Sequence, residues 1–94
     1  MESLQHTATR ALTALLAAQP SSQAKVAFAW QIAAGPTMAR ASRVTWTDGT
    51  LRVRTGSATW RREIVRAKPM LLDRLRHLLG AETIRSMIIE KEAS

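Results

Sequence analysis

The chain has 94 residues, of which 46% are hydrophobic, and a formal net charge of +7 at pH 7. This length allows one small domain with a modest core, and the hydrophobic content excludes wholesale disorder. Because the sequence has no cysteine and no long apolar run, it excludes disulfides, cysteine-ligated metal sites and a membrane-spanning helix. The N-terminus lacks the pattern of a signal peptide, so we expect a cytoplasmic protein.

The excess positive charge is concentrated in one part of the chain. The stretch from Arg40 to Arg76 holds ten lysines and arginines against three acids, whereas cations and acids balance elsewhere. A strongly basic surface attracts polyanions without sequence specificity. The alternative is a basic surface that only keeps the protein soluble.

The N-terminal third predicts two helices. Apolar side chains recur at helical spacing over residues 3–18, and the proline-containing stretch 19–22 ends that helix. Ser22 is a suitable N-cap for the second helix. The predicted apolar face of the second helix comprises Val26, Ala27, Trp30 and Ala33, widened by Phe28 and Ile32.

Gly35-Pro36 allows two alternatives for the end of the second helix. Glycine commonly terminates a helix and proline commonly follows the end, so the pair predicts a stop. Alternatively, the chain kinks here and Pro36 opens a further turn through Arg40.

Asp48-Gly49 lies between two segments of alternating polarity and predicts a β-hairpin. Both residues tolerate the positive φ angles of a two-residue type I′ turn. That turn fixes the register of strands at about 42–47 and 50–57, and directly opposed side chains share one face of the sheet. The predicted buried face is Val44, Trp46, Leu51 and Val53, and the exposed face is Arg43, Thr45, Arg52 and Arg54. The exposed arginines suggest an anionic partner.

The rest of the chain predicts a long helix and a short strand. Ser57 is a suitable cap for a helix whose apolar residues recur from Trp60 to Gly80. Pro69 removes a backbone donor within this run, so we expect two helices or one kinked helix. The apolar, β-branched stretch 84–90 predicts a strand that is buried on both sides or pairs in the middle of the sheet.

These elements follow the order α-α-β-β-α(α)-β and predict an α+β fold. A three-stranded sheet covered on one face by helices buries the apolar side of every element. The arginine-bearing side of the hairpin then stays open to solvent or to a partner.

Few residues support catalysis. His6 and His77 lie in unrelated elements without a neighbouring carboxylate or nucleophile, and the usual metal, phosphate-loop and dinucleotide motifs are missing. Glu63 lies among arginines, which predicts a local ion pair. We therefore expect a protein that is not an enzyme and that has neither a cofactor nor a metal site.

Basic side chains from the hairpin and the following helix form the candidate binding site. Arginine binds phosphate through its bidentate guanidinium group. The three tryptophans occupy apolar positions, which predicts core residues rather than platforms for base stacking. The sequence thus indicates contact with the backbone of DNA or RNA, or with an acidic protein, through Arg43, Arg52, Arg54, Arg61, Arg62, Arg66 and Lys68.

Several short motifs from Val26 to Ile89 resemble the DciA family in their order and spacing. The motifs are Trp30-x4-Gly35, Asp48-Gly49-Thr50-Leu51-x-Val53, Ser57-x-x-Trp60-x-x-Glu63-Ile64, Leu71-Leu72-x-x-Leu75 and Leu79-Gly80. The resemblance implies one KH-like domain over residues 1–94, with an N-terminal helix and linker over 1–20 and a core over 22–90. The sequence lacks the G-x-x-G pair with which ordinary KH domains clamp nucleic acid.

The same resemblance implies a bacterial protein that binds the DnaB-type replicative helicase and assists its loading on DNA. It further implies DNA affinity, for single or double strands, and no ATP hydrolysis by the chain itself. The positions of the tryptophans, in turn, do not indicate sequence-specific base readout. The alternative function is a general nucleic-acid-binding KH-like module associated with RNA or the ribosome. No membrane partner is expected, and the oligomeric state is left open.

Overall fold

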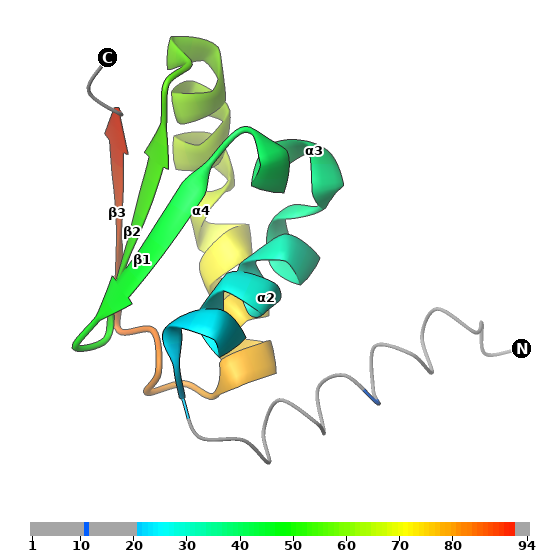
Figure 1. Ribbon diagram of the computed structural model, residues 1–94, viewed down its shortest axis with the longest axis vertical. Helices are drawn as coiled ribbons and strands as arrows, with labels where there is room; N and C mark the ends of the chain where they lie inside the picture. The colour runs from blue at the N-terminus through cyan, green and yellow to red at the C-terminus, as the bar shows by residue number, and fades with distance from the viewer. Residues whose placement is uncertain (1–10, 12–20, 92–94) are drawn as a thin grey trace, which may run out of the picture.

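Helices cover one face of a three-stranded mixed sheet in the computed structural model, which describes residue 11 and residues 21–91 (Figure 1). Except for Ala11, the helix predicted over residues 3–18 lies outside the described residues. The predicted α+β class is confirmed, as is the order of the elements from the second predicted helix onward. The elements are α2 (Gln23–Ala34), α3 (Pro36–Arg40), β1 (Arg43–Thr47), β2 (Thr50–Thr55), α4 (Ala58–Leu79) and β3 (Ser86–Lys91).

Helix α2 begins at the predicted cap and buries a narrower face than the sequence indicated. The hydroxyl of Ser22 accepts a hydrogen bond from the backbone N–H of Lys25 over 3.1 Å. The buried apolar residues are Val26, Ala29, Trp30 and Ala33. Phe28 is 44% exposed, because residues two apart on a helix point to nearly opposite sides and Trp30 takes the buried side. The prediction that Phe28 widens the apolar face is therefore wrong.

The second alternative at Gly35-Pro36 is confirmed. Gly35 has a φ of 84° and breaks the helical path at the end of α2. Pro36 then occupies the first position of α3, where its missing N–H is not needed. This extra turn through Arg40 carries the chain to β1.

The hairpin has the predicted turn and register. Asp48 and Gly49 have φ angles of 49° and 81°, as a type I′ turn requires. All five predicted pairs are present, from Arg43 opposite Arg54 to Thr47 opposite Thr50. The strands are slightly shorter than expected, since β1 begins at Arg43 and β2 ends at Thr55.

Helix α4 is continuous through Pro69, so the two-helix alternative is wrong. The Ser57 hydroxyl accepts a hydrogen bond from the backbone N–H of Trp60 over 3.1 Å, which confirms the predicted cap. Pro69 lies inside the helix on its exposed side. An exposed side of a helix accommodates proline more readily than a buried side does, because water can bond the carbonyl that loses its partner.

Strand β3 pairs parallel to β2 at the edge of the sheet, so the prediction of a central strand is wrong. Because β1 already pairs with one edge of β2, β3 pairs with the other edge of β2 and becomes an outer strand of the sheet. Burial on both sides is also wrong, because Met87 is buried whereas Ile88 is 40% exposed on the opposite face.

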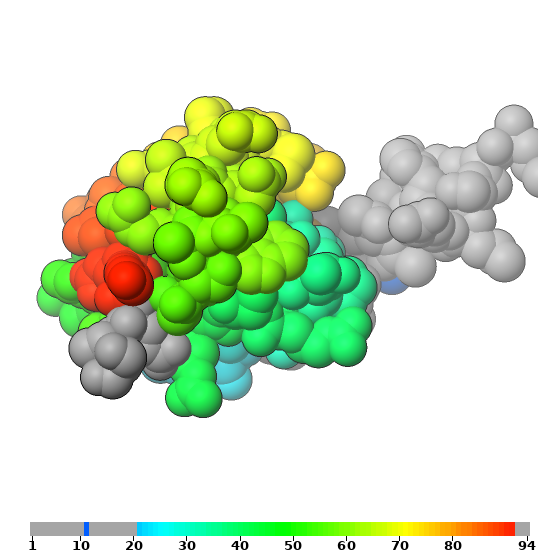
Figure 2. Space-filling model, turned by 90° about the horizontal axis from the view of Figure 1, so that it is seen from above, coloured from blue at the N-terminus to red at the C-terminus, as the bar shows by residue number. Residues whose placement is uncertain are grey.

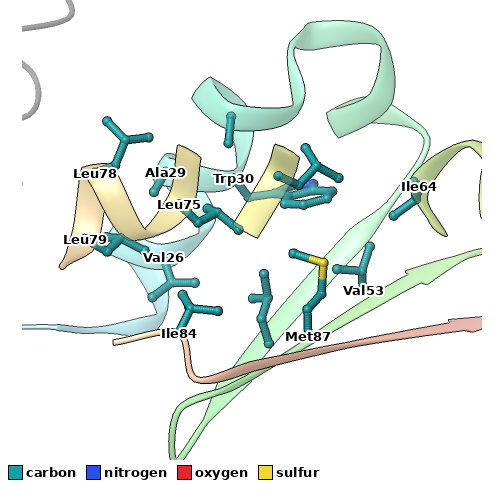
Figure 3. Close-up of a cluster of buried hydrophobic side chains, with 13 residues drawn as sticks. Val26, Ala29, Trp30, Val53, Ile64, Leu75, Leu78, Leu79, Ile84 and Met87 are labelled. Carbon is teal, nitrogen blue, oxygen red and sulfur yellow. The ribbon is translucent and has the colours of Figure 1, made fainter. Parts of the chain in front are cut away.

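The core lies between the sheet and the two longer helices (Figure 3). Leu51 and Val53 of β2 are fully buried, whereas Val44 and Trp46 of the edge strand β1 are half-buried. Trp60 is half-buried at the start of α4. The largest fully buried side chains include Trp30, Leu51, Ile64, Leu71, Leu75 and Ile84.

Replacing Gly49 by alanine is expected to lower the free energy of unfolding by about 1–2 kcal/mol, because a left-handed backbone is unfavourable for residues with a Cβ. Gly49 has a φ of 81°, and an added Cβ would also clash with the guanidinium group of Arg85. Urea denaturation measures the change. Gly56→Ala is the matched control, since no atom lies within 4 Å of its added Cβ. Equal destabilisation by both variants would contradict this account of the turn.

Candidate nucleic-acid interface

The exposed face of the sheet carries three rows of side chains that the strand register defines. Neighbouring strands lie about 4.8 Å apart, so side chains within a row are in contact range. The rows are Thr47, Thr50 and Ser86, then Thr45, Arg52 and Ile88, then Arg43, Arg54 and Glu90. Ile88 is the one apolar side chain among these nine, and the face is otherwise polar and charged.

Arg43, Arg52 and Arg54 lie together on this face, and we call them the arginine face. All three are exposed, and Arg43 lies directly opposite Arg54. The type I′ turn and the alternation of the two strands are sufficient to produce this grouping. A planar guanidinium group presents two parallel donors, which suits phosphate or carboxylate oxygens.

Glu90 is a counter-charge that sequence reasoning missed. Its carboxylate lies 2.5 Å from Nη1 of Arg52 and 3.5 Å from Nε of Arg54. The parallel pairing places Glu90 opposite Arg54, and no local signal in the sequence fixes that register. One carboxylate therefore offsets part of the charge of three arginines.

The predicted cations of α4, namely Arg61, Arg62, Arg66 and Lys68, do not join the arginine face. The buried side of α4 packs on the apolar face of the sheet, so the helix and the arginine face lie on opposite sides of the sheet (Figure 1). Glu63 and Arg66 form the predicted ion pair, with 3.7 Å between their charged atoms. Lys68 is half-buried.

The two groups approach each other only at one end of the molecule. The first turns of α4 lie beside the ends of β2 and β3, and Figure 2 shows β3 in red directly against this part of α4. Arg43 and Arg54 lie in the row of the sheet at that same end. Arg61 and Arg62 are thus the α4 cations nearest to the arginine face along the strand direction.

Three arginines outside the predicted binding set hold the fold together. Arg74 donates to the carbonyl of Ala33 over 3.0 Å, and Arg76 donates to the carbonyl of Ile84 over 3.0 Å. Arg85 donates to the carbonyl of Asp48 over 2.8 Å. These guanidinium groups satisfy backbone carbonyls between elements, a role that their positions in the sequence do not indicate.

The tryptophans do not form a stacking platform on the sheet. The indole N–H of Trp30 donates to Ser42 Oγ over 3.0 Å, and that of Trp46 donates to the carbonyl of Thr83 over 2.9 Å. Trp30 is 2% exposed, and none of the nine register positions of the exposed face is aromatic. The predicted lack of stacking rings on this face is confirmed.

The described residues contain no group of three or more histidine and acidic side chains that could hold a metal ion. His77 is exposed in the last turn of α4, and His6 lies outside the described residues. None of the described helices combines the length and the apolar character that crossing a membrane would require.

A family model described as "Dna[CI] antecedent, DciA" matches residues 3–89. The chain belongs to the DciA family. The match extends the resemblance of residues 26–89 through most of the N-terminal segment, and the α+β fold agrees with the KH-like fold that the resemblance implied. The DciA family has the role of a replicative-helicase loader in DNA replication. No similar curated protein was found.

Replacing Glu90 by glutamine is expected to strengthen binding to heparin about two- to fivefold. The reason is that the Glu90 carboxylate competes with heparin for the arginines, and such an exposed ion pair is worth up to about 1 kcal/mol. Elution from a heparin column at higher salt, together with titration, measures the change. Glu63→Gln makes the same charge change beside Arg66 and is the matched control. A larger shift for Glu63→Gln would place the main polyanion contact on α4 instead.

Proposed function

We propose that this DciA-family chain is a non-enzymatic loader of the DnaB-type replicative helicase that also binds DNA through its backbone. The family supports the helicase-loading role, and the arginine face supports the DNA affinity. The single observation that carries the DNA contact is the placement of Arg43, Arg52 and Arg54 at adjacent register positions of one open sheet face.

The geometry of the arginine face suits a chain of phosphates better than a base sequence. Residues two apart on a strand are separated by about 6.6 Å, so Arg52 and Arg54 present their guanidinium groups side by side along β2. Phosphate contacts position a nucleic acid but carry no sequence information. Without an aromatic ring on that face, bases have no stacking partner there.

Arg61 and Arg62 extend this proposed surface around the end of the sheet. Within the described part of the chain, neither side chain makes a hydrogen bond or an ion pair, so their guanidinium donors are available to a ligand. Arg66 and Lys68 complete the set that the sequence indicated, although Arg66 is already paired with Glu63. We therefore assign the main contact to the arginine face and a secondary contact to the α4 cations.

The triple variant Arg43→Gln, Arg52→Gln and Arg54→Gln is expected to reduce the salt dependence of duplex binding. Each lost phosphate contact lowers the slope of log K against log salt by about 0.9, so the total decrease is about 2–3. Fluorescence anisotropy with a labelled duplex at several salt concentrations measures the slope.

The triple variant Arg61→Gln, Arg62→Gln and Arg66→Gln removes the same charge from α4 and is the comparison. A slope decrease of about 1 or less is expected for it. If the α4 variant lost more binding than the arginine-face variant, the assignment of the main contact would be wrong.

The full chain is expected to capture its cognate purified DnaB-type helicase at low salt, and nuclease treatment should not release it. A direct protein contact survives the removal of nucleic acid, whereas bridging through DNA does not. Size-exclusion chromatography of the mixture, before and after nuclease, measures the complex. Helicase that no longer co-elutes after nuclease would refute direct binding.

A further inference from the structure

The two edges of the sheet differ in how they are covered. On β1, the side-chain amide of Gln23 bonds both the N–H and the C=O of Trp46, with 3.0 Å between the Trp46 nitrogen and Gln23 Oε1. That amide occupies the backbone groups that an added strand would need. Along β3, no described residue bonds the outer edge from Ser86 to Lys91. The β3 edge is therefore the open one.

One side of α4 runs along this open edge. Arg76 donates to the carbonyls of Ile84 and Arg85, over 3.0 and 3.2 Å, where the chain enters β3. Arg74 instead bonds Ala33 of α2, so opposite sides of α4 face β3 and α2. The residues that share the β3 side at helical spacing form what we call the edge stripe: Arg61, Val65, Lys68, Leu72 and Arg76.

The edge stripe combines apolar surface with positive charge. Val65 is 47% exposed, and Leu72 and Lys68 are half-buried. On the other face of β3, Ile88 is exposed in the same row as Arg52. An added strand would therefore meet cations and apolar side chains on the α4 side, and Ile88 between Ser86 and Glu90 on the other side.

We propose that the open edge of β3 and the edge stripe form a docking site for an extended acidic peptide segment of a partner protein. The segment adds to the sheet as a fourth strand, with its backbone pairing to β3. Because side chains alternate between the two faces of a strand, its acidic side chains meet Arg61 and Lys68 on the α4 side, and the apolar side chains between them cover Ile88 on the other side.

Charge favours this occupant over a second copy of the chain. Two copies joined through β3 would bring two positive edge stripes toward each other, and like charges across an interface oppose association. A nucleic acid supplies the negative charge but lacks the alternating N–H and C=O groups that a strand edge requires. The site does not include the arginine face, although it shares Arg61 and Lys68 with the proposed secondary DNA contact on α4.

A capped ten-residue peptide that alternates glutamate with valine or threonine tests the site. Titration into the 15N-labelled full chain is expected to shift the β3 amide signals and to slow their hydrogen exchange. The same peptide with lysine in place of glutamate should not bind. A version with N-methyl groups on alternate residues should bind at least about tenfold more weakly, because it cannot form the backbone ladder.

Charge-reversal variants locate the contact on the protein. The double variant Arg61→Glu and Lys68→Glu is expected to weaken peptide binding at least about tenfold. Arg62→Glu and Arg66→Glu make the same charge change on the outer side of α4 and should leave the affinity within about twofold. Amide spectra of both variants verify that they are folded.

Three results would overturn the proposal. The first is equal weakening by both double variants, and the second is undiminished binding of the N-methylated peptide. The third is a failure of the peptide to protect the β3 amides from exchange, when a single-stranded oligonucleotide or concentration-dependent self-association does protect them. Loss of the proposed DNA or helicase binding would leave this test unaffected, because the probe is a peptide alone.

Discussion

The rest of the structure depends on the double pairing of β2. It is the only strand of the described sheet that is bonded on both edges, antiparallel to β1 and parallel to β3. Its alternation sets both faces at once, since Leu51 and Val53 are fully buried while Arg52 and Arg54 are exposed. The core and the candidate interface are therefore two sides of the same strand.

Local signals predicted the hairpin well because its geometry depends on neighbouring residues alone. The Asp48-Gly49 turn determines which residues pair, and the pairing determines which face is buried. The caps at Ser22 and Ser57 are equally local and are also confirmed. These signals were enough to identify the arginine face and the α+β class.

Non-local contacts were the ones that sequence reasoning missed. The position of β3 depends on how a 22-residue helix packs before the chain returns to the sheet, and neither its edge position nor its register is encoded nearby. Glu90 reaches Arg52 and Arg54 only through that register. Phe28 was assigned to the core because an apolar residue within a helix does not by itself show which side is buried.

Net charge proved a poor measure of the surface that is available for binding. Arg74, Arg76 and Arg85 bond backbone carbonyls of other segments, so they act as connectors within the fold. Long guanidinium side chains can serve either purpose, and composition does not separate the two. The family match and the arrangement of the remaining cations carry the functional conclusion better than the total charge does.

The hairpin turn also determines where the counter-charge of the sheet lies. The carbonyl of Gly49 accepts hydrogen bonds from the backbone N–H groups of Arg85 and Ser86, over 2.7 and 3.2 Å, and so fixes the starting point of β3. Glu90 comes four residues after Ser86 and shares its face, because side chains two or four apart on a strand point the same way. Inserting a single residue between them would send the carboxylate toward the buried face and Ile89 toward the arginines. The register of β3 relative to the turn thus determines whether the arginine face has its counter-charge.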